Sequence, residues 1–305
     1  NTFIKIIIIL SIISLVSSGI YYLMEEKILF SERIHINEDS PNRINPVSST
    51  AITYGNLCMT LFLLNFCALL SKNKVQKKYI YLGIVMSLLS WSFSMTIGSL
   101  VGLIFFILFL FFKSFMKISI KNITGLAGLL IIIALTPLSN KFQLYIVDIK
   151  NLIQGDSVYT SNIDNSIKER VFYIDSAFDI IKENKFIGIG FNKFEEEVKN
   201  RSMVREIKIE ARDHPHNDFL DIGIKAGFLG IVSLIIFYLL LYRFFNRYLY
   251  DNPSYFCISG LSVLLSQLGY MMTQTQFSHH QAIVFFLILL FFFASQIKKY
   301  ERSDI

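Results

Sequence analysis

The sequence predicts an all-α fold: a polytopic bundle of about eight transmembrane helices with one large, partly helical external loop. Hydrophobic residues make up 53% of the 305-residue chain, charged residues make up only 17%, and the mean hydropathy is +0.51. Soluble domains usually carry charge on about 25% of their residues. The apolar residues also gather into long uncharged runs, which is typical of membrane-spanning helices and excludes most soluble globular classes.

A helix needs about 20 apolar residues to cross the ~30 Å hydrocarbon layer. Uncharged runs of suitable length cover residues 6–24, 51–70, 79–112, 123–138, 226–242, 255–272 and 282–297. The run at 79–112 would extend for about 51 Å as one helix, which is too long for a single crossing. We therefore expect two helices there, meeting at residues 94–99, where Gly98 permits a tight turn.

Basic residues between the runs predict the orientation of the helices. They cluster within residues 72–78, 113–121, 243–247 and 298–302. Lysine and arginine collect on cytoplasmic loops, and eight spans place all these clusters on one side. Both termini are then cytoplasmic, and the net charge of +6 indicates topology rather than a nucleic-acid partner. The expected division is residues 1–138 with the first five spans, an external loop at 139–217, and residues 218–305 with the last three spans.

The external loop is expected to contain helices of its own, because an unstructured loop of about 79 residues would be unusual. Asn165 or Ser166 can cap a first helix. Its face is predicted by apolar residues spaced three, four and three apart, namely Val171, Ile174, Phe178 and Ile181. Gly188 and Gly190 interrupt this pattern, and residues 192–205 predict a second, more charged helix.

Histidines mark the end of the loop. The motif Asp213-His214-Pro215-His216-Asn217-Asp218 leads directly into the next span, so both histidines are expected at the outer membrane surface. A solvated loop and a functional site fit this pattern equally well. Asp221 and Lys225 follow as an i,i+4 pair, which offsets part of the cost of charge near hydrocarbon. His279 and His280 form a second external pair, but no recognisable ligand spacing completes a metal site, so no metal is assigned.

Several basic residues lie outside and depart from the positive-inside trend. Arg33 and Arg43 occupy the first external loop, and Arg170 begins the predicted helix next to Lys168. Solvation at the surface is the ordinary explanation. The alternative is a polyanionic ligand, because guanidinium groups bind phosphate in a bidentate manner.

In this order, the motifs resemble those of the bacterial O-antigen ligase and Wzy-type polymerase superfamily. The arginine-led segment Arg170-Val171-Phe172 comes first, then the turn Phe186-Ile187-Gly188-Ile189-Gly190, and then His214-Pro215-His216-Asn217 before a span containing Gly227-Phe228-Leu229-Gly230. The basic loop around Arg43 also fits. The resemblance runs from about Ser31 to the end of the chain.

The resemblance implies a glycosyltransferase of the bacterial inner membrane that needs no cofactor and no metal. Such enzymes move a glycan from an undecaprenyl-pyrophosphate carrier to lipid A–core or a growing polysaccharide on the periplasmic side, with inversion at the anomeric carbon. Membrane lipid is a further implied partner. Matching positions imply His216 or His214 and Arg170 as catalytic residues, and Arg43 as a substrate-binding residue. Asn217 within the histidine motif, Lys168 and Arg33 are further candidates for substrate binding.

The chemistry agrees with these residue types. An acceptor hydroxyl loses a proton as it attacks, and histidine is a suitable general base. Arginines stabilise the charge that grows on a departing pyrophosphate. The family usually has an arginine in the turn at residues 94–99, where this chain has none. Either another basic residue supplies that charge, with Arg33, Arg43 and Lys168 as candidates, or this branch of the family works differently or weakly.

Two alternatives remain open at the level of sequence. A Wzy-type polymerase of O-antigen or capsule repeat units would use the same donor and motifs. A polysaccharide or lipid transporter belongs to another class, but coupled transporters need ionisable residues near mid-membrane. The predicted spans carry almost none beyond Asp221 and Lys225, which argues against a transporter. The ligase is preferred to the polymerase because the histidine motif and the long loop before it resemble those of ligases.

Overall fold

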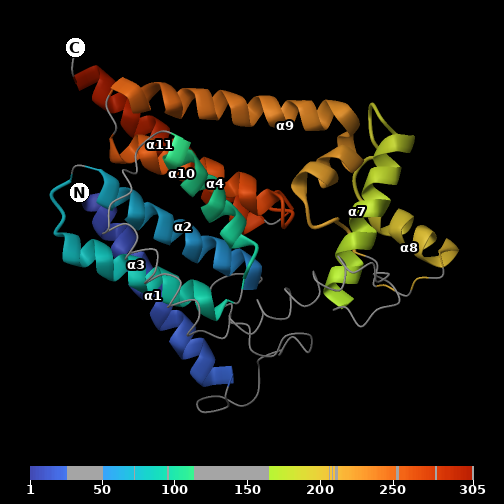
Figure 1. The fold of residues 1–305 in the computed structure, drawn as a ribbon, viewed down its shortest axis with the longest axis horizontal. Helices are drawn as coiled ribbons and strands as arrows, with labels where there is room; N and C mark the ends of the chain where they lie inside the picture. The colour runs from blue at the N-terminus through green and yellow to red at the C-terminus, as the bar shows by residue number, and fades with distance from the viewer. Residues whose placement is uncertain are drawn as a thin grey trace. The chain divides into compact units, whose positions relative to one another are not determined.

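The computed structural model describes residues 1–25, 51–71, 73–94, 96–112, 165–205, 207, 209, 212–251, 254–278 and 280–303. Every regular element in these residues is an α-helix, which confirms the predicted all-α class (Figure 1). Within these described residues, four helices are long and apolar enough to cross a membrane. They are α1 (Thr2–Glu25), α2 (Ala51–Leu70), α9 (Asp218–Asp251) and α11 (His280–Ser303). The predicted span at 123–138 lies outside the described residues.

The predicted break in the run at 79–112 is confirmed. Helix α3 (Lys77–Phe93) ends before the break and α4 (Ser99–Phe112) begins after it. Within the turn, the indole N–H of Trp91 donates to the carbonyl of Thr96 (3.0 Å), and the Thr96 hydroxyl donates to the carbonyl of Ala51 (3.0 Å). Helix α4 and α10 (Tyr255–Met271) are shorter apolar helices.

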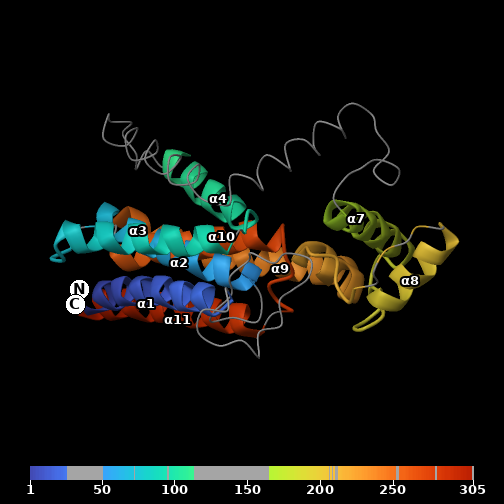
Figure 2. The ribbon, with the colours of Figure 1, turned by 90° about the horizontal axis from the view of Figure 1, so that it is seen from below.

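The described chain forms two compact units. The first contains α1 to α4, the end of α9, most of α10, and α11. Helices α1, α2 and α3 lie side by side in both views (Figures 1 and 2). Small polar side chains join them, with Ser14 and Ser90 hydroxyls 2.9 Å apart and Ser18 and Tyr54 hydroxyls 2.6 Å apart. Such bonds favour helix association in a membrane, where apolar side chains gain nothing by leaving lipid.

The second unit contains α7 (Asn165–Glu183), α8 (Phe194–Val204), the first part of α9, and the loop between α10 and α11. Both helices predicted within the external loop are confirmed, but the predicted face of α7 is not its buried face. Ile174 is 37% exposed and Phe178 is 50% exposed. The buried core consists of Phe172, Tyr173, Ala177, Ile180, Phe194, Val198 and Ile224. Two apolar stripes run along α7, and spacing alone does not identify the stripe that packs.

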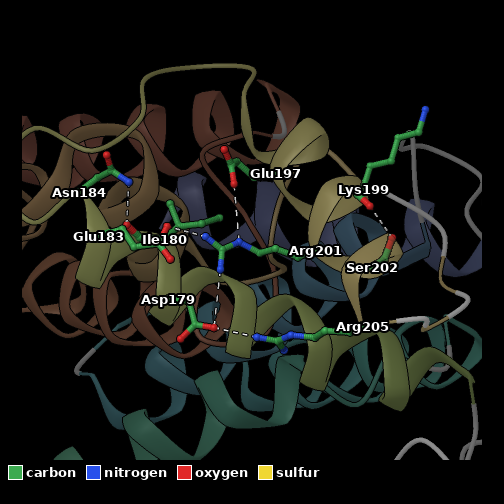
Figure 3. A network of polar contacts seen from close by, with 9 residues as sticks. All are labelled: Asp179, Ile180, Glu183, Asn184, Glu197, Lys199, Arg201, Ser202 and Arg205. Atoms are coloured by element: carbon green, nitrogen blue, oxygen red, sulfur yellow. Dashed lines mark hydrogen bonds and ion pairs between the residues drawn. The ribbon is translucent and has the colours of Figure 1, made fainter.

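Charged side chains lock α7 to α8 in an arrangement that we call the Arg201 clamp (Figure 3). Arg201 bridges three carboxylates, at 2.6 Å from Glu183, 3.7 Å from Asp179 and 3.7 Å from Glu197. Arg205 pairs with Asp179 at 2.8 Å. Arg201 and Arg205 therefore each have an acidic partner within the protein.

Helix α9 changes direction at Gly227, whose φ of 62° is not helical. The first segment of the helix, residues 218–226, therefore ends with carbonyl groups that have no helical partner. Two backbone N–H groups of the turn at residues 185–191, which we call the G-x-G turn, bond to these carbonyls. Ile189 donates to Ile224 (2.8 Å), and Gly190 donates to Lys225 (3.2 Å).

The same turn also pairs with the start of the helix that resumes after the kink. The backbone N–H of Phe228 donates to the carbonyl of Lys185 (2.8 Å). This close backbone approach requires glycine. A Cβ at Gly188 would overlap the carbonyl oxygen of Ile224, and one at Gly227 would overlap the backbone of the turn. The G-x-G turn thus caps both halves of a broken helix, and Gly188 and Gly227 allow the close backbone approach that fixes the orientation of residues 218–226.

Candidate functional site

The residues that begin α9 are hydrogen-bonded to the loop between α10 and α11, residues 272–278. The Asn217 side-chain amide donates to the carbonyl of Met272 (3.1 Å). The fully buried Asp218 carboxylate accepts the backbone N–H groups of Gln276 (2.8 Å) and Phe277 (3.1 Å). Buried donors without partners would cost free energy, so Asp218 holds this loop in place.

His216 is fixed by the same loop. Its Nδ1 lies 3.0 Å from Oε1 of Gln274, and its ring centroid lies 6.0 Å from that of Tyr173. An amide oxygen only accepts, so Nδ1 carries the hydrogen and Nε2 keeps its lone pair. His216 also has a φ of 55°, which costs a residue other than glycine about 1 kcal/mol. The hydrogen bond with Gln274 helps to hold His216 in this uncommon backbone conformation.

Burial keeps this imidazole neutral. Loss of solvent, together with the positive charges of His214, Arg170 and Arg212, lowers the pKa of His216 to about 4. The hydrogen bond with Gln274 acts in the opposite direction. Both arginines therefore lie close enough to His216 for their charges to act on its ring. The site thus combines a neutral His216, whose Nε2 keeps its lone pair, with the positive charges of Arg170 and Arg212.

His214 stacks edge-on against His216, with ring centroids 4.6 Å apart. Its Nδ1 contacts a carboxylate oxygen of Asp213. Burial alone would raise the pKa of Asp213, but the hydrogen bond and the charge of His214 outweigh burial and lower it. Asp213 therefore stays ionised beside the two rings, and it orients His214 rather than His216.

The structure brings together some of the predicted site residues. His214, His216 and Asn217 are adjacent, and Arg170 acts on His216 from α7. Lys168 precedes Arg170 by two residues, so it leaves the helix about 200° around the axis from Arg170, and no contact joins it to His216. Arg33 and Arg43 lie outside the described residues.

Sequence reasoning missed two participants. Arg212 was not singled out, although it stands only four residues before His216 and its position beside the histidine motif was a usable signal. Gln274 gave no signal, because it lies 58 residues further along the chain. The charged pair after the motif is present as predicted, with Lys225 Nζ 2.6 Å from Asp221. Within the described residues, no three His, Cys, Asp or Glu side chains are grouped as metal ligands.

Comparison with known proteins places this site in a family context. The family model described as Wzy_C, O-antigen ligase, matches residues 79–235, just over half of the chain. The matched stretch includes most of α3, all of α4, α7 and α8, the G-x-G turn and the histidine motif. It does not include the loop at residues 272–278 that bonds to the histidine motif. A search of curated proteins gave no match.

Proposed function

The chain belongs to the O-antigen ligase family, and we propose that it transfers a glycan from undecaprenyl pyrophosphate to lipid A–core or a similar acceptor. The family makes it a membrane protein and a glycosyltransferase-like enzyme. The proposed location is the bacterial inner membrane, with the site on the periplasmic face and both termini in the cytoplasm. One observation carries the proposal: a neutral His216 with a fixed tautomer lies in the field of Arg170 and Arg212.

In the proposed reaction, His216 is the general base. The acceptor hydroxyl oxygen attacks the anomeric carbon of the donor sugar from the face opposite the leaving group, which inverts that carbon. The bond between this carbon and the phosphate oxygen breaks, and its electron pair leaves with the lipid pyrophosphate. The hydroxyl proton moves to Nε2 of His216. Gln274 supports this step because it keeps the hydrogen on Nδ1 and leaves Nε2 free to accept.

Arg170 and Arg212 are proposed to bind the pyrophosphate. Negative charge grows on the leaving group as the sugar departs, and guanidinium groups stabilise phosphate oxygens without a metal. The same anion would partly cancel the two charges that lower the pKa of His216. Donor binding would therefore raise the pKa of His216 and make it a stronger base when the acceptor arrives. Asn217 and His214 are proposed to line the acceptor side, with Lys168, Arg33 and Arg43 as further substrate contacts.

The decisive experiment measures transfer by purified protein in vesicles that contain carrier-linked glycan and acceptor. Replacing both His216 and Arg170 should abolish transfer while the protein remains inserted and folded. His216→Asn is the matched single variant, because asparagine tolerates a positive φ and keeps a polar side chain but does not act as a base. If the doubly replaced protein still transferred glycan at the wild-type rate, the proposed chemistry would be wrong.

A second measurement separates the ligase from a polymerase. In a strain that lacks this protein, a ligase defect should remove all long chains from lipopolysaccharide and leave carrier-linked polymer behind. The observation of core carrying a single repeat unit would instead mean that the protein is a polymerase. Complementation with wild-type protein restores the pattern, whereas His216→Asn should not.

A further inference from the structure

The G-x-G turn, which joins α7 to α8 in Figure 1, presents large apolar side chains to its surroundings. Phe186 is 71% exposed, Ile187 is 77% exposed and Phe191 is 75% exposed. Single apolar residues on a surface are ordinary, but three within six positions form a patch that calls for a partner. The backbone role of the turn in capping α9 does not account for these side chains.

The position of the turn relative to the membrane follows from its contacts with α9. The helix resumes at Phe228, whose N–H bonds to the carbonyl of Lys185. From there, residues 228–249 extend for about 33 Å, close to the ~30 Å of a hydrocarbon layer. Phe228 and Leu229, at 59% and 63% exposed, begin the apolar surface of this span. The patch on the turn is therefore continuous with a membrane-facing surface at its outer boundary.

Charges beside the patch suit the headgroup region. Lys185 and Lys193 flank the apolar residues on either side, and Lys182 lies one helical turn earlier; all three side chains are exposed. Lysine carries a long apolar stem with a terminal charge, so it can reach anionic headgroups while apolar neighbours enter the acyl region. The aromatic ring of Phe191 also lies 5.7 Å from the Lys225 ammonium, next to the kink.

We propose that the G-x-G turn is a membrane anchor that inserts Phe186, Ile187 and Phe191 into the external leaflet, with the flanking lysines on anionic headgroups. The occupant of this surface is bilayer lipid. The turn holds both α7 and the start of α9, so insertion fixes the depth of Arg170 and His216 relative to the membrane surface. Such anchoring is separate from glycan transfer and does not depend on its chemistry.

The test uses nitroxide labels on the full chain in nanodiscs of phosphatidylethanolamine and phosphatidylglycerol. Ile187→Cys and Phe191→Cys carry the label, and both native side chains are exposed, so the core is not disturbed. Native Cys58, Cys67 and Cys257 are buried and should not react. Lys199→Cys on α8 is the matched control, because its side chain points away from the protein (Figure 3).

Power saturation compares accessibility to oxygen, which enters lipid, with accessibility to a water-soluble nickel chelate. We expect the ratio of oxygen to nickel accessibility to be several-fold higher for labels at 187 and 191 than for the label at 199. Equal ratios at all three positions would overturn the proposal. Shielding from nickel that arises only when carrier-linked glycan is added would also overturn it, because the patch would then bind the donor lipid instead of the bilayer.

Discussion

Arg201 and Arg170 belong to the same compact unit but have different surroundings. Arg201 lies among the carboxylates of Asp179, Glu183 and Glu197, so its charge is neutralised inside the Arg201 clamp. Arg170 has no ion-pair partner within the described part of the chain, and its charge acts on His216. A neutralised arginine stabilises packing, whereas an arginine beside a neutral imidazole is available to an anion. The difference distinguishes structural cations from those proposed to bind substrate.

The largest effect that would test this comparison comes from removing one arginine of each kind. Arg170→Ala should lower the rate of glycan transfer by about 10²–10³ fold, the usual cost of losing one group that stabilises transition-state charge. Its thermal unfolding should stay near that of wild type. Transfer assays and thermal unfolding in detergent measure the two quantities.

Arg205→Ala is the control, because Arg205 pairs with Asp179 and does not act on His216. It should lose about 0–1 kcal/mol of stability, as expected for a partly exposed ion pair, and keep its transfer rate. The comparison would fail if Arg205→Ala lost transfer as severely as Arg170→Ala.

A second prediction asks whether the site, unlike the clamp, is held by backbone contacts. Gly188→Ala should destabilise the protein by about 2–4 kcal/mol, because the added methyl group meets the Ile224 carbonyl and the residue keeps a φ of 73°. Gly190→Ala is the matched variant. It has open space around its Cβ, so it should lose only about 1 kcal/mol from its φ of 85°. Thermal unfolding gives both values, and similar losses would mean that crowding against α9 is unimportant.

Local pattern was enough to predict much of this fold. The break at residues 94–99, helices α7 and α8, and the placement of the histidine motif before a candidate span all follow from composition and spacing. The absent arginine of that turn also has a structural counterpart. Ser94 and Thr96 are buried there, and the Thr96 hydroxyl is bonded to the first residue of α2.

Long-range pairing could not be predicted in the same way. Gln274 and His216 are 58 residues apart, and neither segment carries a sequence signal that identifies the other as its partner. The helical period identified α7 but not its packed stripe, because Ile174 and Phe178 are as apolar as the residues that face the core. The kink at Gly227 depends on a partner turn that caps it, so a glycine motif alone did not reveal it.

The smallest expected effect concerns pH, and it distinguishes the neutral His216 from the charged groups of the Arg201 clamp. The pKa of His216 is lowered to about 4, so wild-type transfer should lose its neutral base only as the pH falls through about 4. The unfolded chain binds this proton near pH 6.5. The contribution to stability is therefore fully present above that value and declines as the pH falls from about 6.5 to 4.

Gln274→Glu should change the pH dependence of both transfer and stability. A carboxylate beside Nδ1 favours the imidazolium, which raises the pKa of His216 by about 1–3 units and shifts the acid limb of the transfer profile upward by the same amount. Gln274→Ala is the control: it removes the hydrogen bond that raises this pKa, so its limb should not move upward. An acid limb that stays in place in Gln274→Glu would show that another group is the base, and that the hydrogen bond between Gln274 and His216 is structural, like the ion pairs of the Arg201 clamp.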